Sequence, residues 1–184
     1  MPRKTPKSSS AEVIDWPAAI HRALKAQRVR QVSYVPDAGH KRLIELCHSD
    51  EDMAAVPLTT EEEGIALAAG AWLGGERAAL LTQSSGVGNC VNALTLASNC
   101  GFPLLILVTM RGEWGEFNPW QIPMGQGTPA TLRLAGVHAL RLERAEEALT
   151  TVTAAAKLAF GGYGAVAVLI AQRMIGAKSF GDEP

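Results

Sequence analysis

Three almost uninterrupted apolar runs, each about as long as a strand, constrain this sequence more than any other feature. They occupy residues 78–83, 103–109 and 165–171 and are rich in Ala, Leu, Ile and Val. A strand that is apolar at nearly every position is buried on both faces, which requires helices on both sides of a parallel sheet. The sequence therefore predicts a doubly wound α/β fold.

Strand-like and helix-like segments alternate along the rest of the chain at short intervals. We expect a mostly parallel six-stranded sheet with helices on both faces. The expected strands are residues 31–35, 53–57, 78–83, 103–109, 137–142 and 165–171. The expected helices are residues 15–27 (with Asp15 as N-cap and Pro17 in the first turn), 41–48, 61–74, 87–99, 129–135 and 145–160.

Length and composition limit what such a chain can be. The 184 residues suit a single domain, expected over residues 11–184, which follows a flexible cationic tail over residues 1–10. With 17 basic and 18 acidic residues, the formal net charge is −1, so we expect no nucleic-acid partner. The longest apolar stretch, residues 102–110, is about half the roughly 20 residues that cross a bilayer, so no membrane span is expected.

The cysteines and histidines indicate neither a disulfide framework nor a metal site. Cys47, Cys90 and Cys100 form no even set of pairs and no CxxC pattern. The four histidines lack metal-ligand spacing to one another. The opening MPRKTPKSSS has no apolar region or cleavage site of a signal peptide. These features predict a cytoplasmic protein.

The loops that follow the strands hold the residues with chemical potential. In open α/β sheets, ligands bind at the carboxyl ends of the strands, so these loops should lie along one edge. They are residues 36–40, 58–61, 83–89 and 110–127, the last of which is expected to be largely irregular over residues 111–127.

The segment TTEEEGIALAAGAW places three carboxylates at the start of a helix, directly after a strand. A capping box formed by Thr60 and Glu63 would explain Glu63 as a structural residue. It explains Glu61 less well, because the first residue after the strand points toward the ligand edge. Glu61 is therefore the candidate for a functional carboxylate, with helix capping as the alternative.

The segment QSSGVGN, residues 83–89, predicts a glycine-containing turn between a strand and a helix. Such a turn can present backbone N–H groups to an anion or to the edge of a cofactor. The segment matches neither the dinucleotide fingerprint, nor the P-loop, nor the elbow of a serine nucleophile. An ordinary tight turn is the alternative interpretation.

The third candidate is Arg111, just beyond a buried strand. Its guanidinium can pair with a carboxylate, sulfonate or phosphonate, and a structural pair with Glu113 or Glu116 is the alternative. Nearby aromatic residues in a hydrophilic loop, Trp114, Phe117 and Trp120, favour a surface that a partner covers.

His40 is the one histidine in a loop at the expected ligand edge. A group that titrates near neutrality could move a proton or hold an anion there. A solvated loop histidine is the alternative.

Taken together, these motifs resemble the pyrimidine-binding domain of thiamine diphosphate-dependent enzymes, in particular the alpha subunits of sulfopyruvate decarboxylases and the corresponding half of phosphonopyruvate decarboxylases. The resemblance runs from about residue 12 to residue 175 and is carried by VPDAGH, TTEEEGIALAAGAWLGG, LLTQSSGVGNCVNALTLAS, PLLILVTMRGEWGE and QIPMG. It implies that residues 11–184 form one pyrimidine-binding domain.

The resemblance also implies roles for individual residues. Glu61, nine residues before Gly70, corresponds to the glutamate whose carboxyl hydrogen-bonds a ring nitrogen of the aminopyrimidine and thereby activates the cofactor. The other implied residues are Gly86, Gly88 and Asn89 around the pyrimidine, Arg111 and Gln121 at the substrate, and His40 at the substrate or in catalysis.

The family's diphosphate-binding half, with its GDG motif and Mg²⁺-binding asparagines, is not found in this sequence. The resemblance therefore implies a beta subunit that supplies it and binds Mg²⁺, in a hetero-oligomer that is active only when complete. The implied reaction is decarboxylation of a 2-oxo acid with a second anionic group, such as 3-sulfopyruvate or 3-phosphonopyruvate, to CO₂ and an aldehyde.

Two departures from the family pattern, Ala38 in the first loop and Met110 before the RGE block, concern the substrate. Two alternatives therefore stay open. One is a carboligase or a decarboxylase of an uncharged 2-oxo acid, and the other is a non-catalytic assembly module with the same fold.

Overall fold

The computed structural model describes residues 14–176, which contain a sheet of six strands. The strands are β1 (Val29–Tyr34), β2 (Ala54–Pro57), β3 (Arg77–Gln83), β4 (Leu104–Thr109), β5 (His138–Leu142) and β6 (Ala165–Ile170). Their order in the sheet is β2-β1-β3-β4-β6-β5, and each neighbouring pair is parallel. The predicted parallel α/β sheet is confirmed.

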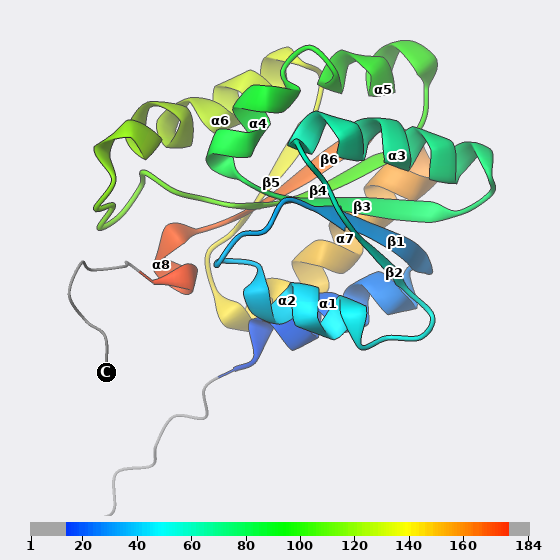
Figure 1. Ribbon diagram of the computed structural model, residues 1–184, viewed down its shortest axis with the longest axis horizontal. Helices are drawn as coiled ribbons and strands as arrows, with labels where there is room; N and C mark the ends of the chain where they lie inside the picture. Colours follow the sequence, from blue (N-terminus) through cyan, green and yellow to red (C-terminus); the bar gives the residue numbers. More distant parts are fainter. Residues whose placement is uncertain (1–13, 177–184) are drawn as a thin grey trace, which may run out of the picture.

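Helices cover both faces of this sheet (Figure 1). The helices are α1 (Trp16–Ala26), α2 (Lys41–His48), α3 (Glu61–Leu73), α4 (Ser84–Cys90), α5 (Leu94–Cys100), α6 (Ile122–Leu134), α7 (Ala148–Gly162) and α8 (Gln172–Ile175), with 3₁₀ turns η1 (Pro119–Gln121) and η2 (Ala145–Glu147). Asp15 accepts a hydrogen bond from the N–H of Ala18 at 3.0 Å, which confirms it as the first N-cap. Within the part of the chain described, no helix is long and apolar enough to cross a membrane.

The two faces have separate apolar cores. Helices α1, α2 and α7 lie on one face of the sheet, and α3, α4, α5 and α6 lie on the other (Figure 1). Buried side chains of each group form the core on its own face. Successive residues of a central strand alternate between these cores, as Leu80 and Leu81 do in β3. All residues of β4 and β6 are buried, as the apolar runs predicted. Burial of each large side chain contributes about 1.5–3 kcal/mol, so these central strands anchor the sheet.

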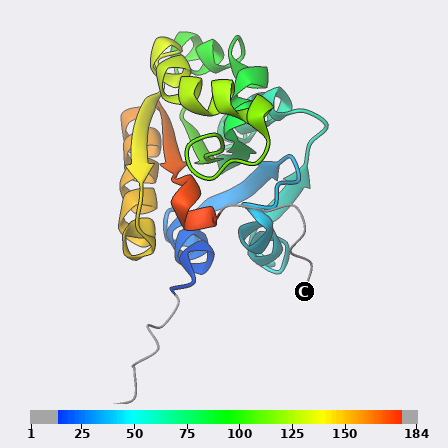
Figure 2. The ribbon, with the colours of Figure 1, turned by 90° about the vertical axis from the view of Figure 1, so that its left-hand side faces the viewer.

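The strand order creates two places where neighbouring loops diverge. From β1 the chain moves outward to β2 and then crosses to β3 on the other side of β1, so β1 and β3 flank a switch point. A second one lies between β4 and β6, because β5 is outside β6. Ligands of open α/β sheets bind at the carboxyl ends of strands at such points. Figure 2 looks onto this edge, with α8 and the loop that precedes α6 in front.

Two segments are more helical than the sequence indicated. The expected glycine turn after β3 is instead the start of α4, and the expected single helix over residues 87–99 is two helices, α4 and α5. Likewise α6 begins at Ile122, not at Pro129, which lies inside this helix. Tertiary packing outweighs the weak helix propensity of IPMGQGT here, because Leu132 of α6 is buried in the core and Thr128 Oγ1 donates to the carbonyl oxygen of Ser84 in α4 at 3.2 Å.

The predicted capping box at the start of α3 is wrong, because Glu63 pairs with Thr59 and not with Thr60. The Thr60 side chain makes no capping hydrogen bond. Glu63 instead accepts from the backbone N–H of Thr59 at 2.9 Å and from the Thr59 hydroxyl at 2.8 Å. These bonds lower the pKa of the Glu63 carboxyl below its usual value. Glu63 is thus a structural residue, as expected, and Glu61 takes no part in this cap.

Candidate active site

Glu61 is the first residue of α3 and lies at the carboxyl edge of the sheet, directly after the loop that follows β2. Only 6% of its surface is exposed. The side-chain amide of Asn89 donates to Glu61 Oε2 at 2.8 Å. Among the described residues, no hydrogen bond to Oε1 is found, and Oε1 is the oxygen that faces Gly86 of α4. Asn89 therefore holds one carboxylate oxygen, and the other keeps its capacity to accept a hydrogen bond.

Gly86 allows α4 to approach this carboxylate. A Cβ atom at Gly86 would lie 2.3 Å from Glu61 Oε1 and 2.2 Å from Thr82 Oγ1, well inside van der Waals contact. The structure thus brings together three residues that the sequence singled out: Glu61, Gly86 and Asn89. Gly88 is placed differently, since its Cβ would meet Met124 Sδ on α6 at 3.2 Å.

His40 is buried, with 1% of its surface exposed, so the solvated alternative is wrong. Its Nε2 lies 3.1 Å from the carbonyl oxygens of both Thr82 and Leu107, which makes Nε2 the protonated nitrogen. Burial lowers the pKa of His40 below its usual range, although Asp37 and the two carbonyl groups oppose this shift. His40 is therefore a neutral residue that ties the first loop to β3 and β4, and its contact with substrate stays a prediction.

Arg111 forms a bidentate pair with Glu116. Its Nε donates to Glu116 Oε2 at 2.9 Å, and its Nη2 donates to Oε1 at 2.8 Å. Burial would raise the pKa of Glu116, but hydrogen bonds from Arg111 and from backbone N–H groups outweigh it and lower the pKa to about 2. Of the two expected structural partners, Glu113 is the wrong one, because Arg141 of β5 binds it through two contacts of 2.5 and 2.6 Å.

A cavity of about 120 Å³ lies beside Arg111 at the carboxyl ends of β1 and β4. The Thr109 hydroxyl at its wall donates to Asp37 Oδ2 at 2.7 Å. Because its pair with Glu116 uses two of its five N–H groups, the guanidinium of Arg111 keeps donors for a ligand in the cavity. The residues that line the cavity are Asp37, Ala38, Gly39, Thr109, Arg111, Ile175 and Gly176.

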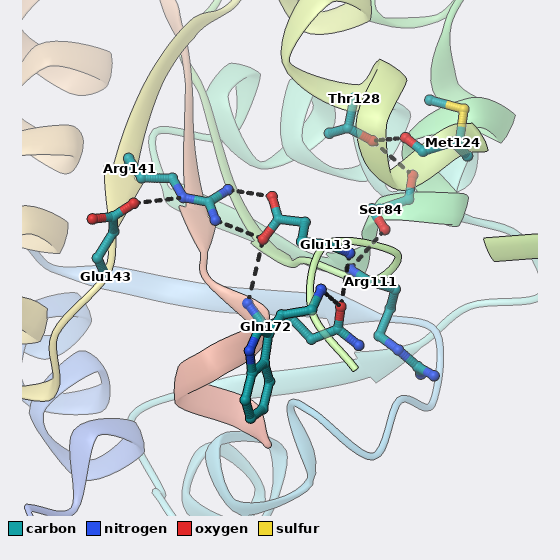
Figure 3. A network of polar contacts seen from close by, with 9 residues as sticks. Ser84, Arg111, Glu113, Met124, Thr128, Arg141, Glu143 and Gln172 are labelled. Atoms are coloured by element: carbon teal, nitrogen blue, oxygen red, sulfur yellow. Dashed lines mark hydrogen bonds and ion pairs between the residues drawn. The ribbon is translucent and has the colours of Figure 1, made fainter. Parts of the chain in front are cut away.

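The sequence did not indicate Asp37 or Gln172 as functional residues. Asp37 lies in the loop of residues 36–40, in which only His40 was expected to take part in function. Gln172 lies two residues beyond Ile170, where strand β6 ends, and the loop after this strand was not among those expected at the ligand edge. Figure 3 shows Gln172 beside Glu113, whose carboxylate holds Arg141. The signal that could have found Gln172 is its place as a polar residue just after a fully buried strand.

Gln121 lies in η1 with 7% of its surface exposed, and its Oε1 has no hydrogen-bond partner among the described residues. Its backbone packs against the Arg111 loop, where Gly112 has a φ of +73° and a Cβ would lie 2.7 Å from the Gln121 carbonyl oxygen. The aromatic side chains of this region differ in exposure: Trp114 is 46% exposed and Trp120 is 71% exposed. Within residues 14–176, no group of three His, Cys, Asp or Glu residues could hold a metal ion.

A buried carboxylate at the carboxyl edge of a parallel sheet, beside a switch point, is a candidate cofactor-binding site. Sequence comparison identifies the class of protein to which such a domain belongs. Residues 15–118 match the family described as thiamine pyrophosphate enzyme, N-terminal TPP binding domain. The chain belongs to this family, which confirms the fold and the family that the motifs predicted.

Individual proteins with similar sequences include subunits of sulfopyruvate decarboxylases and a phosphonopyruvate decarboxylase. The chain is 35% identical over 153 residues to the sulfopyruvate decarboxylase subunit alpha of Methanococcus maripaludis, which covers 83% of this chain and 92% of that protein. It is 36% identical over 131 residues to the subunit alpha of Methanocaldococcus jannaschii, covering 71% and 78%. A phosphonopyruvate decarboxylase of Streptomyces viridochromogenes is 40% identical over 89 residues, 48% of this chain and 22% of that protein.

Among solved structures, a 2-oxoglutarate:ferredoxin oxidoreductase from Magnetococcus marinus is similar, with a TM-score of 0.69. The match covers 87% of this chain and only 29% of the oxidoreductase chain. At 14% sequence identity, this likeness shows the fold alone.

Proposed function

We propose that this chain is the alpha subunit of a two-chain, thiamine diphosphate-dependent decarboxylase. Its substrate is a 2-oxo acid with a second anionic group, such as 3-sulfopyruvate or 3-phosphonopyruvate, and its products are CO₂ and an aldehyde. The observation that carries the proposal is the Glu61 carboxylate, which is buried at the carboxyl edge, accepts from Asn89 on one oxygen and has no hydrogen bond to the other oxygen among the described residues. The names of the curated relatives support the substrate class.

The residues around Glu61 fit an aminopyrimidine ring. Oε1, which accepts no hydrogen bond within the described chain, would bind a ring nitrogen and share a proton with it. Asn89 fixes the orientation of the carboxylate through Oε2, and Gly86 keeps α4 close enough to shield it from water. When bound, thiamine diphosphate supplies a carbon nucleophile and holds the electrons that CO₂ leaves behind.

The cavity beside Arg111 is the proposed place for the substrate. The free N–H groups of Arg111 would bind the distal anion. Gln121 and His40 would either contact the substrate or support the residues that line the cavity. Charge-assisted hydrogen bonds of this kind select sulfonate and phosphonate over a neutral group. Asp37 brings acidic charge to the wall of this cavity, and Glu116 already pairs with Arg111. These observations keep decarboxylation of an uncharged 2-oxo acid, or carboligation, as a second candidate.

A beta subunit would complete the site by binding the diphosphate of the cofactor together with Mg²⁺. We propose that it docks at the loop before α6 and covers the exposed rings of Trp114 and Trp120. The working enzyme is then a cytoplasmic hetero-oligomer, and this chain alone is inactive. The retained Glu61 favours an enzyme over a non-catalytic module with the same fold.

The experiment that tests the proposal is reconstitution of both chains with thiamine diphosphate and Mg²⁺, followed by assay of CO₂ release from 3-sulfopyruvate, 3-phosphonopyruvate and pyruvate. Glu61→Gln should keep the fold, because Glu63 holds the start of α3, yet lose roughly 10²–10⁴ in rate as proton transfer to the cofactor fails. Exposed Glu62 is the matched control, and Glu62→Gln should be nearly silent. Small and equal effects of both substitutions would contradict the assignment.

A further inference from the structure

The buried side chain of Gln172 joins α8 to the loop that carries Arg111. Only 2% of its surface is exposed. Its Oε1 accepts from the backbone N–H groups of Glu113 and Trp114, both at 2.9 Å. Its Nε2 donates to Glu116 Oε2, also at 2.9 Å. One amide thus satisfies donors of the loop backbone and an acceptor on the loop's buried carboxylate.

Glu116 links Gln172 to Arg111. Its Oε2 accepts from Gln172 Nε2, from Arg111 Nε at 2.9 Å and from the N–H of Gly112 at 3.1 Å. Of these three donors, only Gln172 comes from outside the loop. A bidentate guanidinium pair is planar and directional, so the position of the carboxylate sets the direction in which the remaining N–H groups of Arg111 point.

We propose that Gln172 is a positioning residue for substrate recognition: it fixes Glu116, which in turn aims the unpaired N–H groups of Arg111 into the cavity beside Asp37. Gln172 does not line that cavity, whereas Arg111 does. The inference rests on the proposed function, in which this cavity receives the distal anion of a 2-oxo acid.

Two substitutions separate this role from simple support of the loop. Gln172→Glu keeps the size and the acceptor for the two loop N–H groups, but it replaces the donor to Glu116 by a second carboxylate. Gln172→Leu removes both the acceptor for the two loop N–H groups and the donor to Glu116. If Gln172 only held the loop backbone, Gln172→Glu would behave like the unsubstituted chain. If it positions Glu116, both variants lose recognition of the anion.

The assay uses the complex with the beta subunit, thiamine diphosphate and Mg²⁺. Gln172→Glu should raise KM for 3-sulfopyruvate by about 10–100-fold, with kcat nearly unchanged, because a charge-assisted contact to the substrate is misdirected. Activity on pyruvate, which has no distal anion, should change little. Combined with Arg111→Met, Gln172→Glu should add almost no further loss, since both act through one guanidinium.

Arg141→Met is the matched control, because it breaks the Glu113 pair on the other side of the same loop and leaves the contacts of Glu116 in place. Arg141→Met should change the activity on 3-sulfopyruvate and on pyruvate to the same extent, or change neither. Equal losses on both substrates in Gln172→Glu, wild-type behaviour of Gln172→Glu, or losses that multiply with Arg111→Met would overturn the proposal.

A binding measurement keeps this inference separate from the proposed function. If the unsubstituted complex decarboxylates none of the 2-oxo acids, the proposed function is wrong. Titration with sulfoacetate, a non-reactive dianion, then tests Gln172 directly by calorimetry. A Kd about tenfold or more higher in Gln172→Glu than in the unsubstituted complex supports the positioning role, and an unchanged Kd rejects it.

Discussion

Replacing Gly86 with alanine should disable the proposed site with little effect elsewhere. The new Cβ would lie 2.2 Å from Thr82 Oγ1, 2.3 Å from Glu61 Oε1 and 2.6 Å from Glu61 Cδ. Ordinary contacts begin near 3.4 Å, so α4 and the carboxylate must separate by about 1 Å. The buried strand residue Thr82 cannot easily move, because it belongs to the fully buried part of β3.

The magnitude follows from two opposing effects. Overpacking of this kind costs about 1–3 kcal/mol. The glycine-to-alanine change within a helix returns about 0.5–1 kcal/mol. The net loss is about 0–2.5 kcal/mol, which should lower Tm by up to about 10 °C for a chain of this size. Displacement of a catalytic carboxylate by about 1 Å should cost about 10²-fold in rate.

The assay compares Tm and kcat of Gly86→Ala with those of Gly70→Ala, both in the complex with the beta subunit. Gly70 lies in α3, the helix that begins with Glu61, and a Cβ there meets nothing within 4 Å. Gly70→Ala should therefore keep its activity and gain about 0.5–1 kcal/mol in stability. If Gly86→Ala matches Gly70→Ala in both measurements, the contact between α4 and the Glu61 carboxylate has been misjudged.

Two further predictions concern the loop before α6. The folded-state pKa of Glu116 is lowered to about 2 from 4.5, so its contribution to stability is fully present above about pH 5 and is lost as the pH falls toward 2. Urea unfolding should therefore show that Glu116→Gln lowers the free energy of unfolding much more at pH 7 than at pH 3. An equal loss at both pH values would refute the buried pair. Mixing with the beta subunit should shift tryptophan emission to shorter wavelength, because the exposed ring of Trp120 becomes covered. Trp120→Phe should reduce this shift more than replacement of the half-buried Trp72 does. An unchanged shift in Trp120→Phe would exclude the loop before α6 as the contact with the beta subunit.

The sequence alone determined the layered architecture. Apolar runs at β4 and β6 require burial on both faces, and this local pattern does not depend on which strand lies next to which. It also placed Glu61 at the carboxyl edge, because the residue that follows a strand and its short loop in a parallel sheet lies there by geometry. The family motifs then identified this glutamate among three neighbouring acidic residues.

Only the tertiary structure decided which chemically equivalent partners meet. Glu113 and Glu116 are both within reach of Arg111 along the chain, and the choice depends on Arg141, which β5 brings to Glu113 from 28 residues away. His40 is buried for a similar reason, since its two acceptors belong to β3 and β4. Local spacing specifies which face of an element is apolar, whereas ion pairs and buried hydrogen bonds depend on strand order and loop closure, which this sequence encodes only through the packing of the whole fold.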